Sequence, residues 1–210
     1  MIATKALRKA AAQGDADAMF RLGYRLAFGR KRPRPTRWRD VVKLWRRAAE
    51  AGHIRAQFYL GTCYGFGDGV RRDFRQAMRW YRMAAEKGYA SAQYNLALGY
   101  AKGDGVPQDN ARRAFWLAKA AQNGHVGAQR NLGYCLHEGE GVRRNYAKAA
   151  QWYRRAAKAG DRMAQFNLGL CYRDGEGVRE SDRWAKYWLS TAACKGHRRA
   201  RRILKEMQSQ

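Results

Sequence analysis

The chain has 210 residues, and 43 lysines and arginines against 17 aspartates and glutamates give it a formal net charge of +26. Hydrophobic residues make up 46%, which is enough to bury a core and excludes a wholly disordered chain, while 3 prolines against 22 glycines exclude a collagen-like or proline-rich one. No apolar run is long enough to cross a bilayer.

The first predicted element is a helix over residues 1–13, which carries Ala10-Ala11 just before Gly14. The same spacing of an Ala-Ala pair and a glycine closes every later repeat, so we expect this helix to cap the N-terminal end of a repeat array. The segment lacks the apolar stretch that a secretory signal needs. This predicts a cytoplasmic protein, or a periplasmic or secreted one if the sequence is part of a longer chain.

Five repeat units follow, at residues 14–51, 52–87, 88–123, 124–159 and 160–195. They share an Ala-Ala pair before a glycine, and most share an Ala-Gln pair after it and a Gly-acid-Gly-Val turn further on. The recurring glycines are 36 residues apart, at Gly52, Gly88, Gly124, Gly160 and Gly196. A fixed period of this length indicates a solenoid of stacked supersecondary units.

Each unit is predicted to contain two helices. In the unit 52–87, Ala56, Leu60 and Tyr64 recur at the spacing of one helical face, which predicts a first helix, the A helix, over residues 54–65. The Gly67-Asp68-Gly69 turn ends this helix, and a second helix, the B helix, follows an N-cap residue. The N-cap residues predicted for the B helices after such turns are Asp73, Asp109, Asn145 and Ser181.

The two ends of the array depart from this pattern. In the first unit, which is two residues longer than the others, the basic stretch from Gly29 to Pro35 replaces the turn. Residues 196–210 carry Ala200, Ile203 and Leu204 and are predicted to form a second capping helix. The sequence therefore predicts an all-α solenoid that forms a single domain over residues 1–210.

The repeat is similar to a known family. The units AQFYLGTCYGFGDGVRRDFRQAMRWYRMAAEKG, from Ala56, and AQFNLGLCYRDGEGVRESDRWAKYWLSTAACKG, from Ala164, resemble Sel1-like repeats. The resemblance covers the five units and implies a right-handed α/α superhelix of antiparallel helix pairs, like that of tetratricopeptide arrays. It also implies an adaptor that holds partner proteins or peptides on the concave face formed by the A helices.

A cysteine-rich branch of that family is described as binding or hydrolysing β-lactams, and it pairs cysteines within each unit where this chain has Ala85 and Ala92. Here Cys63, Cys135 and Cys171 occupy one position of successive repeats. Stacked helices lie about 10 Å apart, whereas a disulfide requires Cα atoms within about 7 Å, so we expect buried free thiols. Cys194 stands apart, near a turn.

The histidines give little support for a metal or catalytic site. His53, His125 and His197 each follow the repeat glycine, and this recurrence indicates a preference of the turn rather than metal binding. His137 and Glu138 are neighbours at the end of an A helix, where a solvated pair is favoured over acid–base chemistry. We expect no catalytic residue, metal, cofactor or small-molecule substrate.

The A helices offer a candidate partner-binding groove. Two recurring positions would form an aromatic and apolar row suited to a peptide, although recurrence in a repeat also favours packing between neighbouring helices. The predicted groove residues are Phe20, Tyr24, Phe58, Thr62, Tyr94, Leu98, Arg130, Tyr134, His137, Phe166 and Leu170. Arg130 interrupts the aromatic row and is therefore its most informative member.

Positive charge gathers in two clusters, in the first loop and on the last helix. The residues predicted to form these basic patches are Arg30, Lys31, Arg32, Arg34, Arg198, Arg199, Arg201 and Arg202. Such an excess predicts attraction to polyanions. The sequence therefore predicts a non-catalytic scaffold or adaptor that binds an acidic or amphipathic protein segment on the concave face. The alternatives are electrostatic binding of nucleic acid or an anionic membrane surface, and a β-lactam-binding or hydrolysing enzyme.

Overall fold

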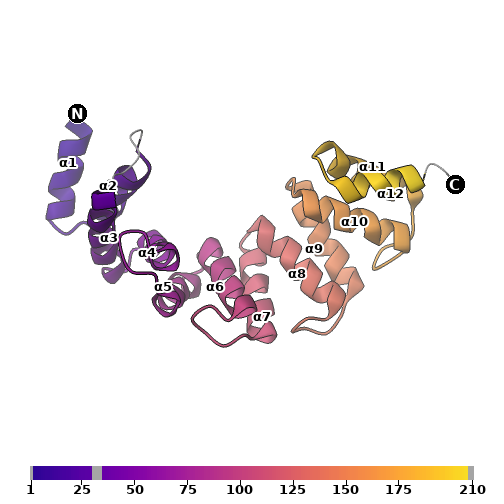
Figure 1. Cartoon of the computed structure of the whole chain (residues 1–210), viewed down its shortest axis with the longest axis horizontal. Helices are drawn as coiled ribbons and strands as arrows, with labels where there is room; N and C mark the ends of the chain where they lie inside the picture. Colours follow the sequence, from indigo (N-terminus) through magenta and orange to yellow (C-terminus); the bar gives the residue numbers. More distant parts are fainter. Residues whose placement is uncertain (1, 30–34, 208–210) are drawn as a thin grey trace. The chain divides into compact units, whose positions relative to one another are not determined.

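The computed structural model describes residues 2–29 and 35–207 of the chain (Figure 1). Within these residues it contains twelve helices and no strand, which confirms the predicted all-α repeat fold. None of the described helices is both long enough and apolar enough to cross a membrane. The chain divides into two compact units, residues 1–108 and residues 109–210.

The first unit begins with the capping helix α1 and continues with two helix pairs and a further A helix. Each A helix packs against the B helix that follows it, and each B helix packs against the next A helix. The helices are α1 (Ile2–Ala12), α2 (Ala16–Phe28), α3 (Pro35–Glu50), α4 (Ile54–Phe66), α5 (Phe74–Glu86) and α6 (Ala90–Lys102). The predicted A helix over residues 54–65 is therefore observed as α4.

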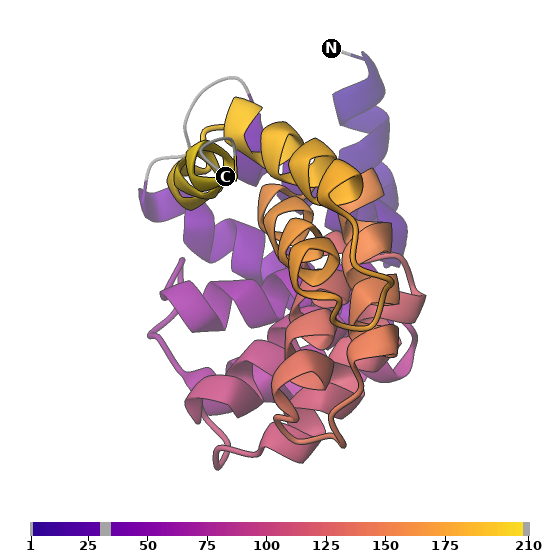
Figure 2. The same cartoon turned by 90° about the vertical axis from the view of Figure 1, so that its right-hand side faces the viewer.

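The second unit contains a B helix, two helix pairs and a closing helix. Figures 1 and 2 show α10, α11 and α12 packed side by side at the C-terminal end. The helices are α7 (Asn110–Gln122), α8 (Val126–Glu138), α9 (Tyr146–Lys158), α10 (Arg162–Asp174), α11 (Asp182–Cys194) and α12 (Arg198–Glu206). Helices α1 and α12 thus lie within the segments 1–13 and 196–210, for which capping helices were predicted.

The B helices begin at the predicted N-cap residues. The side chains of Asp73, Asp109, Asn145 and Ser181 each accept a hydrogen bond from the backbone N–H three residues later. These bonds satisfy amide groups that a helix end otherwise leaves without a partner. The sequence identified these caps correctly because small polar residues at this position have a specific backbone role.

The A helices begin at a different set of caps, in which histidine is prominent. The Nδ1 atoms of His53, His125 and His197 accept hydrogen bonds from the backbone N–H groups of residues 56, 128 and 200. Asp15 and Asp161 do the same with carboxylate oxygens. The recurrence of histidine after the repeat glycine therefore reflects helix capping.

Glycines in the turns allow the repeats to stack closely. Gly175 ends α10 in the left-handed conformation at φ 71°. Gly177 follows at φ 72°, and a Cβ atom there would overlap the backbone carbonyl of Tyr146 at the start of the preceding B helix. Within the helices, a Cβ at Gly61 would lie 2.8 Å from the ring of Tyr81. Helix α5 therefore approaches α4 closely at Gly61.

Glutamine links consecutive repeats at their buried centre. The Nε2 atom of Gln57 donates to the carbonyl of Ala49 at 3.1 Å, and Gln165 donates to the carbonyl of Ala157 at 3.0 Å. These carbonyls belong to the last turn of a B helix and also accept the backbone N–H groups of Gly52 and Gly160, so each glutamine donates to the second lone pair of a carbonyl that the turn already uses. The Ala-Gln pair of the repeat therefore has a defined structural role that its sequence pattern did not indicate.

Candidate partner-binding surfaces

The aromatic row of the A helices serves mainly as packing between repeats. The Phe20 ring is 3% exposed and stacks on the His53 ring, with centroids 4.7 Å apart. The Phe166 ring is 4% exposed and stacks on the His197 ring at 4.1 Å. The structure thus places these two predicted groove residues in the interior, where a partner has little access to them.

The same contact explains why Arg130 interrupts the row. Phe20, Phe58 and Phe166 each meet the residue that caps the next A helix, as Phe58 meets Tyr89 with ring centroids 5.1 Å apart. At Arg130 the next cap is Asp161, and the guanidinium donates to its Oδ2 atom at 3.0 Å. A ring pair has therefore been exchanged for an ion pair. Arg130 was expected to mark the groove, but its charge is already matched within the protein.

The remaining predicted residues of α4 and α6 are half-buried. Phe58 also contacts Tyr81, and the Thr62 hydroxyl donates to the Phe58 carbonyl at 2.9 Å within the same helix. Tyr94 and Leu98 lie on α6. Leu98 lines a cavity together with residues of α4 and α5.

In the second unit, Tyr134 is 42% exposed and is the most accessible predicted groove residue there. The Glu140 carboxylate, whose Oε1 lies 3.5 Å from its hydroxyl, raises the pKa of Tyr134. Glu140 also accepts from Arg113 at 2.6 Å. Leu170 is half-buried and packs against the core around Phe166.

His137 links the end of α8 to the turn after α10 in the second unit. Its Nδ1 lies 2.9 Å from Glu138 and its Nε2 lies 2.7 Å from Glu176, which belongs to the turn after α10. Burial lowers the pKa of His137, but the hydrogen bonds to Glu176 and Glu138 outweigh it, so that its pKa is raised. The ring meets Tyr146 edge-on at 5.1 Å. The solvated pair predicted for His137 and Glu138 is therefore part of a larger interaction.

The first unit carries an exposed aromatic patch that the sequence did not single out in full. We define it as Tyr24, Phe28 and Tyr59, with Tyr24 39% and Phe28 54% exposed. The three rings lie 4.8 to 6.0 Å from one another. The Arg55 guanidinium lies 6.0 Å from the centre of the Tyr24 ring and also bonds the Tyr59 hydroxyl, while burial raises the Tyr59 pKa.

Of these, the sequence identified only Tyr24, because the position of Tyr59 carries asparagine in the three later repeats and that of Phe28 is aromatic again only at Phe66. The four-residue spacing from Phe20 through Tyr24 to Phe28 could have indicated the patch, since side chains at this spacing share a helix face. Such a cluster of accessible rings beside an arginine is suited to binding another protein.

The described basic patch covers the outer face of α12. Arg198, Arg199, Arg201 and Arg202 are exposed, while Ala200 and Ile203 are buried on the opposite face. The Arg199 guanidinium lies 5.6 Å from the Phe166 ring, and Arg202 lies 3.6 Å from Glu206. The other predicted basic patch, Arg30, Lys31, Arg32 and Arg34, lies outside the described residues.

A recurring arginine–tyrosine contact, which was not predicted from the sequence, links B helices to the A helices that follow them. A B-helix arginine donates to the hydroxyl of a tyrosine 18 residues later, in the next A helix, at 2.9 to 3.0 Å. The pairs are Arg46–Tyr64, Arg82–Tyr100 and Arg154–Tyr172. A regular Arg-to-Tyr spacing of 18 residues was the signal that could have revealed them.

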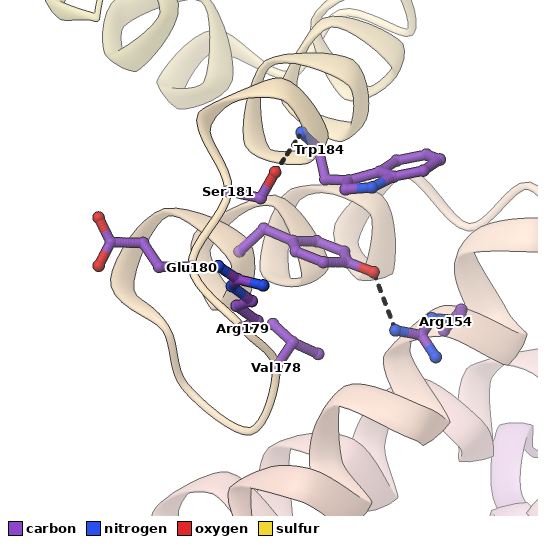
Figure 3. A pocket seen from close by; sticks show the side chains of 7 residues that line it. Arg154, Val178, Arg179, Glu180, Ser181 and Trp184 are labelled. Carbon is purple, nitrogen blue, oxygen red and sulfur yellow. Dashed lines mark hydrogen bonds between the residues drawn. The ribbon is translucent and has the colours of Figure 1, made fainter.

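An open pocket lies beside the last of these contacts. Figure 3 shows Arg154, Val178, Arg179 and Trp184 around it. Trp184 stacks on Tyr172 with ring centroids 6.1 Å apart. The equivalent pocket in the first unit is formed around Tyr64 and contains Arg71, Arg72 and Arg75. Guanidinium groups beside aromatic rings can bind carboxylate or phosphate groups.

The buried cysteines are unsuited to nucleophilic chemistry. Cys63, Cys135 and Cys171 are buried free thiols, as predicted, and Cys194 is exposed. Burial raises the pKa values of Cys63 and Cys171 to about 12. Because the thiolate is the reactive form, these two groups remain protonated and unreactive at neutral pH.

Comparisons with known proteins agree with this architecture. The Sel1 repeat model matches residues 16–35, 42–53, 54–89, 90–125, 126–161 and 162–197. The four complete matches begin two residues after the predicted unit boundaries, at the first residues of α4, α6, α8 and α10. No curated protein is similar enough to the sequence to count as a match.

Two solved structures cover nearly the whole chain. One is c5321, a protective antigen present in uropathogenic Escherichia coli strains and displaying an SLR fold, with 36% identity, a TM-score of 0.89, and coverage of 97% of this chain and 43% of that one. The other is a Sel1 repeat protein from Oxalobacter formigenes, with 35% identity, a TM-score of 0.84, and coverage of 96% and 57%. The chain thus spans roughly half the length of these relatives.

A more distant similarity concerns the fold alone. Cysteine rich protein B of Helicobacter pylori is 24% identical, with a TM-score of 0.50 over 63% of this chain and 96% of that one. The repeat matches, the two close structures and the stacked helix pairs lead to one conclusion. The chain belongs to the Sel1 repeat family, a family of α-solenoids whose members generally mediate protein–protein interactions.

Proposed function

We propose that this protein is a non-catalytic scaffold that binds an acidic or amphipathic segment of a partner protein on the face formed by its A helices. The observation that carries the proposal is the aromatic patch of Tyr24, Phe28 and Tyr59 with Arg55 beside it. Exposed rings supply apolar contact area, and arginine supplies a planar donor for carboxylates. In a chain with a net charge of +26, an acidic partner is the electrostatic complement.

The A-helix face of the first unit is favoured over that of the second. In the second unit, Arg130 is paired with Asp161 and Tyr134 lies beside Glu140, so acidic groups already occupy the neighbourhood of both. In the first unit, Arg55 contacts the rings of Phe20 and Tyr24 instead. A partner carboxylate would therefore meet fewer competing carboxylates beside Tyr24 than beside Tyr134.

The test compares two substitutions that change the net charge equally. Arg55→Glu reverses a charge beside the aromatic patch, and Arg79→Glu reverses one on the exposed side of α5. Each variant is used to capture partners from nuclease-treated host extract, and the captured segment is then titrated as a purified peptide by fluorescence anisotropy. We expect Arg55→Glu to weaken binding by about tenfold or more and Arg79→Glu to have a much smaller effect. Equal weakening by both variants would contradict the proposed site.

Phe28→Ser provides a second test that leaves the net charge unchanged. The ring is more than half exposed, so its removal should disturb the fold little while removing apolar contact with the partner. We expect weaker binding of the same acidic peptide. Unchanged binding of this variant would remove the aromatic patch from the interface.

A second candidate function is electrostatic binding of a polyanion, either nucleic acid or an anionic membrane surface. The arginine-rich pockets beside Tyr64 and Tyr172 and the exposed face of α12 favour it. This function predicts binding to duplex DNA, RNA or anionic vesicles that falls steeply with salt, because each phosphate contact releases counterions. Absence of binding to all three at low salt would exclude it.

A further inference from the structure

A cavity in the first unit has a filled counterpart in the second. The cavity has a volume of about 220 Å³ and is bounded by the ends of α4 and α6 and the start of α5. Its lining includes Gly65, Phe74, Tyr81, Leu98 and Asp104. Two repeats later, 72 residues along the chain, the corresponding residues are His137, Tyr146, Tyr153, Leu170 and Glu176.

The first-unit cavity and the corresponding site around His137 share several wall contacts. Tyr81 bonds the side chain of Asn95 in the first unit, and Tyr153 bonds that of Asn167 in the second. An arginine also lies over the aromatic ring at the start of each B helix, with Arg72 5.5 Å from the Phe74 ring and Arg144 5.6 Å from the Tyr146 ring. The walls differ in size at two further positions, where Met78 and Gly99 take the places of Ala150 and Cys171, and the side chain that enters the space differs as well.

In the second unit, that side chain is an imidazole. The His137 ring meets Tyr146 edge-on and its Nε2 lies 2.7 Å from Glu176. In the first unit, Gly65 contributes no side chain. A Cβ atom at Gly65 would meet only ordinary contacts, with the Tyr81 hydroxyl at 3.6 Å and the Ala77 Cβ at 3.9 Å. The space that the His137 side chain enters in the second unit is thus part of the cavity in the first.

The polar groups that an imidazole requires are also present. Asp104 takes the place of Glu176, and within the described residues its carboxylate makes no hydrogen bond or ion pair. Phe66 takes the place of Glu138, so the first-unit cavity offers one carboxylate and an additional ring. A planar ring with one N–H donor matches this combination better than a wholly apolar group, which would bury the carboxylate without a partner.

We propose that this cavity is a binding site for the imidazole ring of a histidine side chain from a partner protein. The ring packs against Phe74 as His137 packs against Tyr146, and its N–H donates to Asp104. Lys102, on the rim, takes the place of Asp174 and can contact an acidic residue beside that histidine. This site is separate from the aromatic patch, and its test requires no knowledge of the partner.

The test titrates the full ¹⁵N-labelled chain with 4-methylimidazole, the free analogue of a histidine side chain, at constant pH. We expect saturable shifts of the backbone amide signals of Gly65, Gly99 and Asp104, with a Kd on the order of millimolar for so small a ligand. Gly65→His places an imidazole in the cavity from within and should weaken binding by about tenfold or more. Glu86→His, on an exposed site of α5, adds the same group elsewhere and should leave binding unchanged.

Two further measurements examine the chemistry of the site. Asp104→Asn should weaken binding of 4-methylimidazole, and toluene should bind more weakly than 4-methylimidazole because it has no N–H to donate. His137→Gly should create a second saturable site, reported by the amide of Leu170. If His137→Gly does not fold, the Gly65→His and Asp104→Asn variants still decide the question. The proposal is overturned if 4-methylimidazole does not bind, if Gly65→His leaves its binding intact, or if toluene binds more tightly.

Discussion

At the scale of single residues, the three histidine caps connect helix stability to pH. A cap of this kind needs an unprotonated Nδ1, because a protonated nitrogen cannot accept the backbone N–H. Burial lowers the pKa of His125 and of His197, and nearby arginines act in the same direction. Both residues cap helices of the second unit, α8 and α12.

We therefore expect the free energy of unfolding to fall on acidification through these two histidines. Their folded-state pKa values lie below the unfolded value of about 6.5, so their contribution is present above that pH and is lost as pH falls through the folded values. His125→Asn with His197→Asn keeps a capping oxygen but removes the titration. Urea unfolding between about pH 7.5 and 5 should show a shallower pH dependence in the double variant. An identical dependence in the two proteins would contradict this role.

His137 affects the pH dependence of the free energy of unfolding in the opposite direction. Although burial lowers its pKa, hydrogen bonds to Glu176 and Glu138 prevail and raise it, so the imidazolium is favoured in the folded protein. Its stabilising contribution is complete below about pH 6.5 and disappears as pH rises through the folded value. Gln at this position removes the charge while keeping a hydrogen-bonding group.

We expect His137→Gln to lose more stability relative to the natural sequence at pH 5.5 than at pH 8. Because the side chain is partly exposed, water screens these ion pairs and the difference will be modest. Parallel urea unfolding curves at the two pH values measure it. A larger loss at pH 8 would show that the hydrogen bonds of the neutral ring, rather than its charge, hold Glu176.

At the scale of secondary-structure elements, the turns between helices place different demands on their glycines, as Gly124 between α7 and α8 and Gly177 between α10 and α11 show. Gly124 and Gly177 both have positive φ, at 83° and 72°. A Cβ at Gly124 would have no neighbour within 4 Å, whereas one at Gly177 would overlap the backbone of Tyr146. The two glycines are therefore required for different reasons.

Alanine substitution at each glycine separates the conformational penalty from the steric overlap. Gly124→Ala should cost about 1–2 kcal/mol, which is the conformational penalty alone. Gly177→Ala adds a steric overlap with the backbone of a preceding helix, for which overpacking costs about 1–3 kcal/mol more. Chemical denaturation of the two variants measures the difference. Equal losses would mean that the turn after α10 can move away from α9 without cost.

The sequence predicted the elements of the repeat better than the accessibility of its side chains. Caps such as Asp73 are dictated by local backbone requirements, which a repeated residue type reveals. Whether Phe20 is buried depends on the cap of the next A helix, His53, which lies 33 residues away. Burial at such a position is a property of residue pairs across repeats, so one recurring aromatic position could not distinguish packing from a groove.

The exchange at Arg130 illustrates the same limit. Considered alone, an arginine in an aromatic row suggests a binding site, but considered with Asp161 it is one half of an internal ion pair. Likewise, the sequence alone gives Gly65 no special role, whereas comparison with His137 shows that a side chain at this position can fill the cavity. Comparing equivalent positions of different repeats in three dimensions therefore supplies information that the alignment of one position does not.

At the scale of the whole molecule, charge repulsion opposes the packing of the repeats. Even if all 17 acidic residues were paired, 26 of the 43 lysines and arginines would lack an acidic partner. Excess charge of one sign destabilises a compact state through self-repulsion. Added salt screens this repulsion, since the Debye length falls from about 30 Å at 0.01 M to about 10 Å at 0.1 M.

Screening also weakens favourable ion pairs, so added salt has two opposite effects on the stability of the fold. Exposed pairs such as Arg202–Glu206 contribute about 0–1 kcal/mol each, and less exposed ones such as Arg113–Glu140 are screened less than the long-range repulsion. The surplus of cations therefore prevails. We expect the thermal unfolding midpoint to rise by a few degrees as NaCl increases from about 0.01 M to 0.15 M.

A variant with lower charge tests whether repulsion is the cause. Arg198→Glu with Arg201→Glu changes two exposed residues of α12 and lowers the net charge from +26 to +22, since each replacement removes one positive and adds one negative charge. Its midpoint should be higher than that of the natural sequence at 0.01 M NaCl, and the two should converge at high salt because screening makes the lost repulsion irrelevant. A midpoint that falls with salt in both proteins would show instead that ion pairs such as Arg113–Glu140 dominate the electrostatic free energy of the fold.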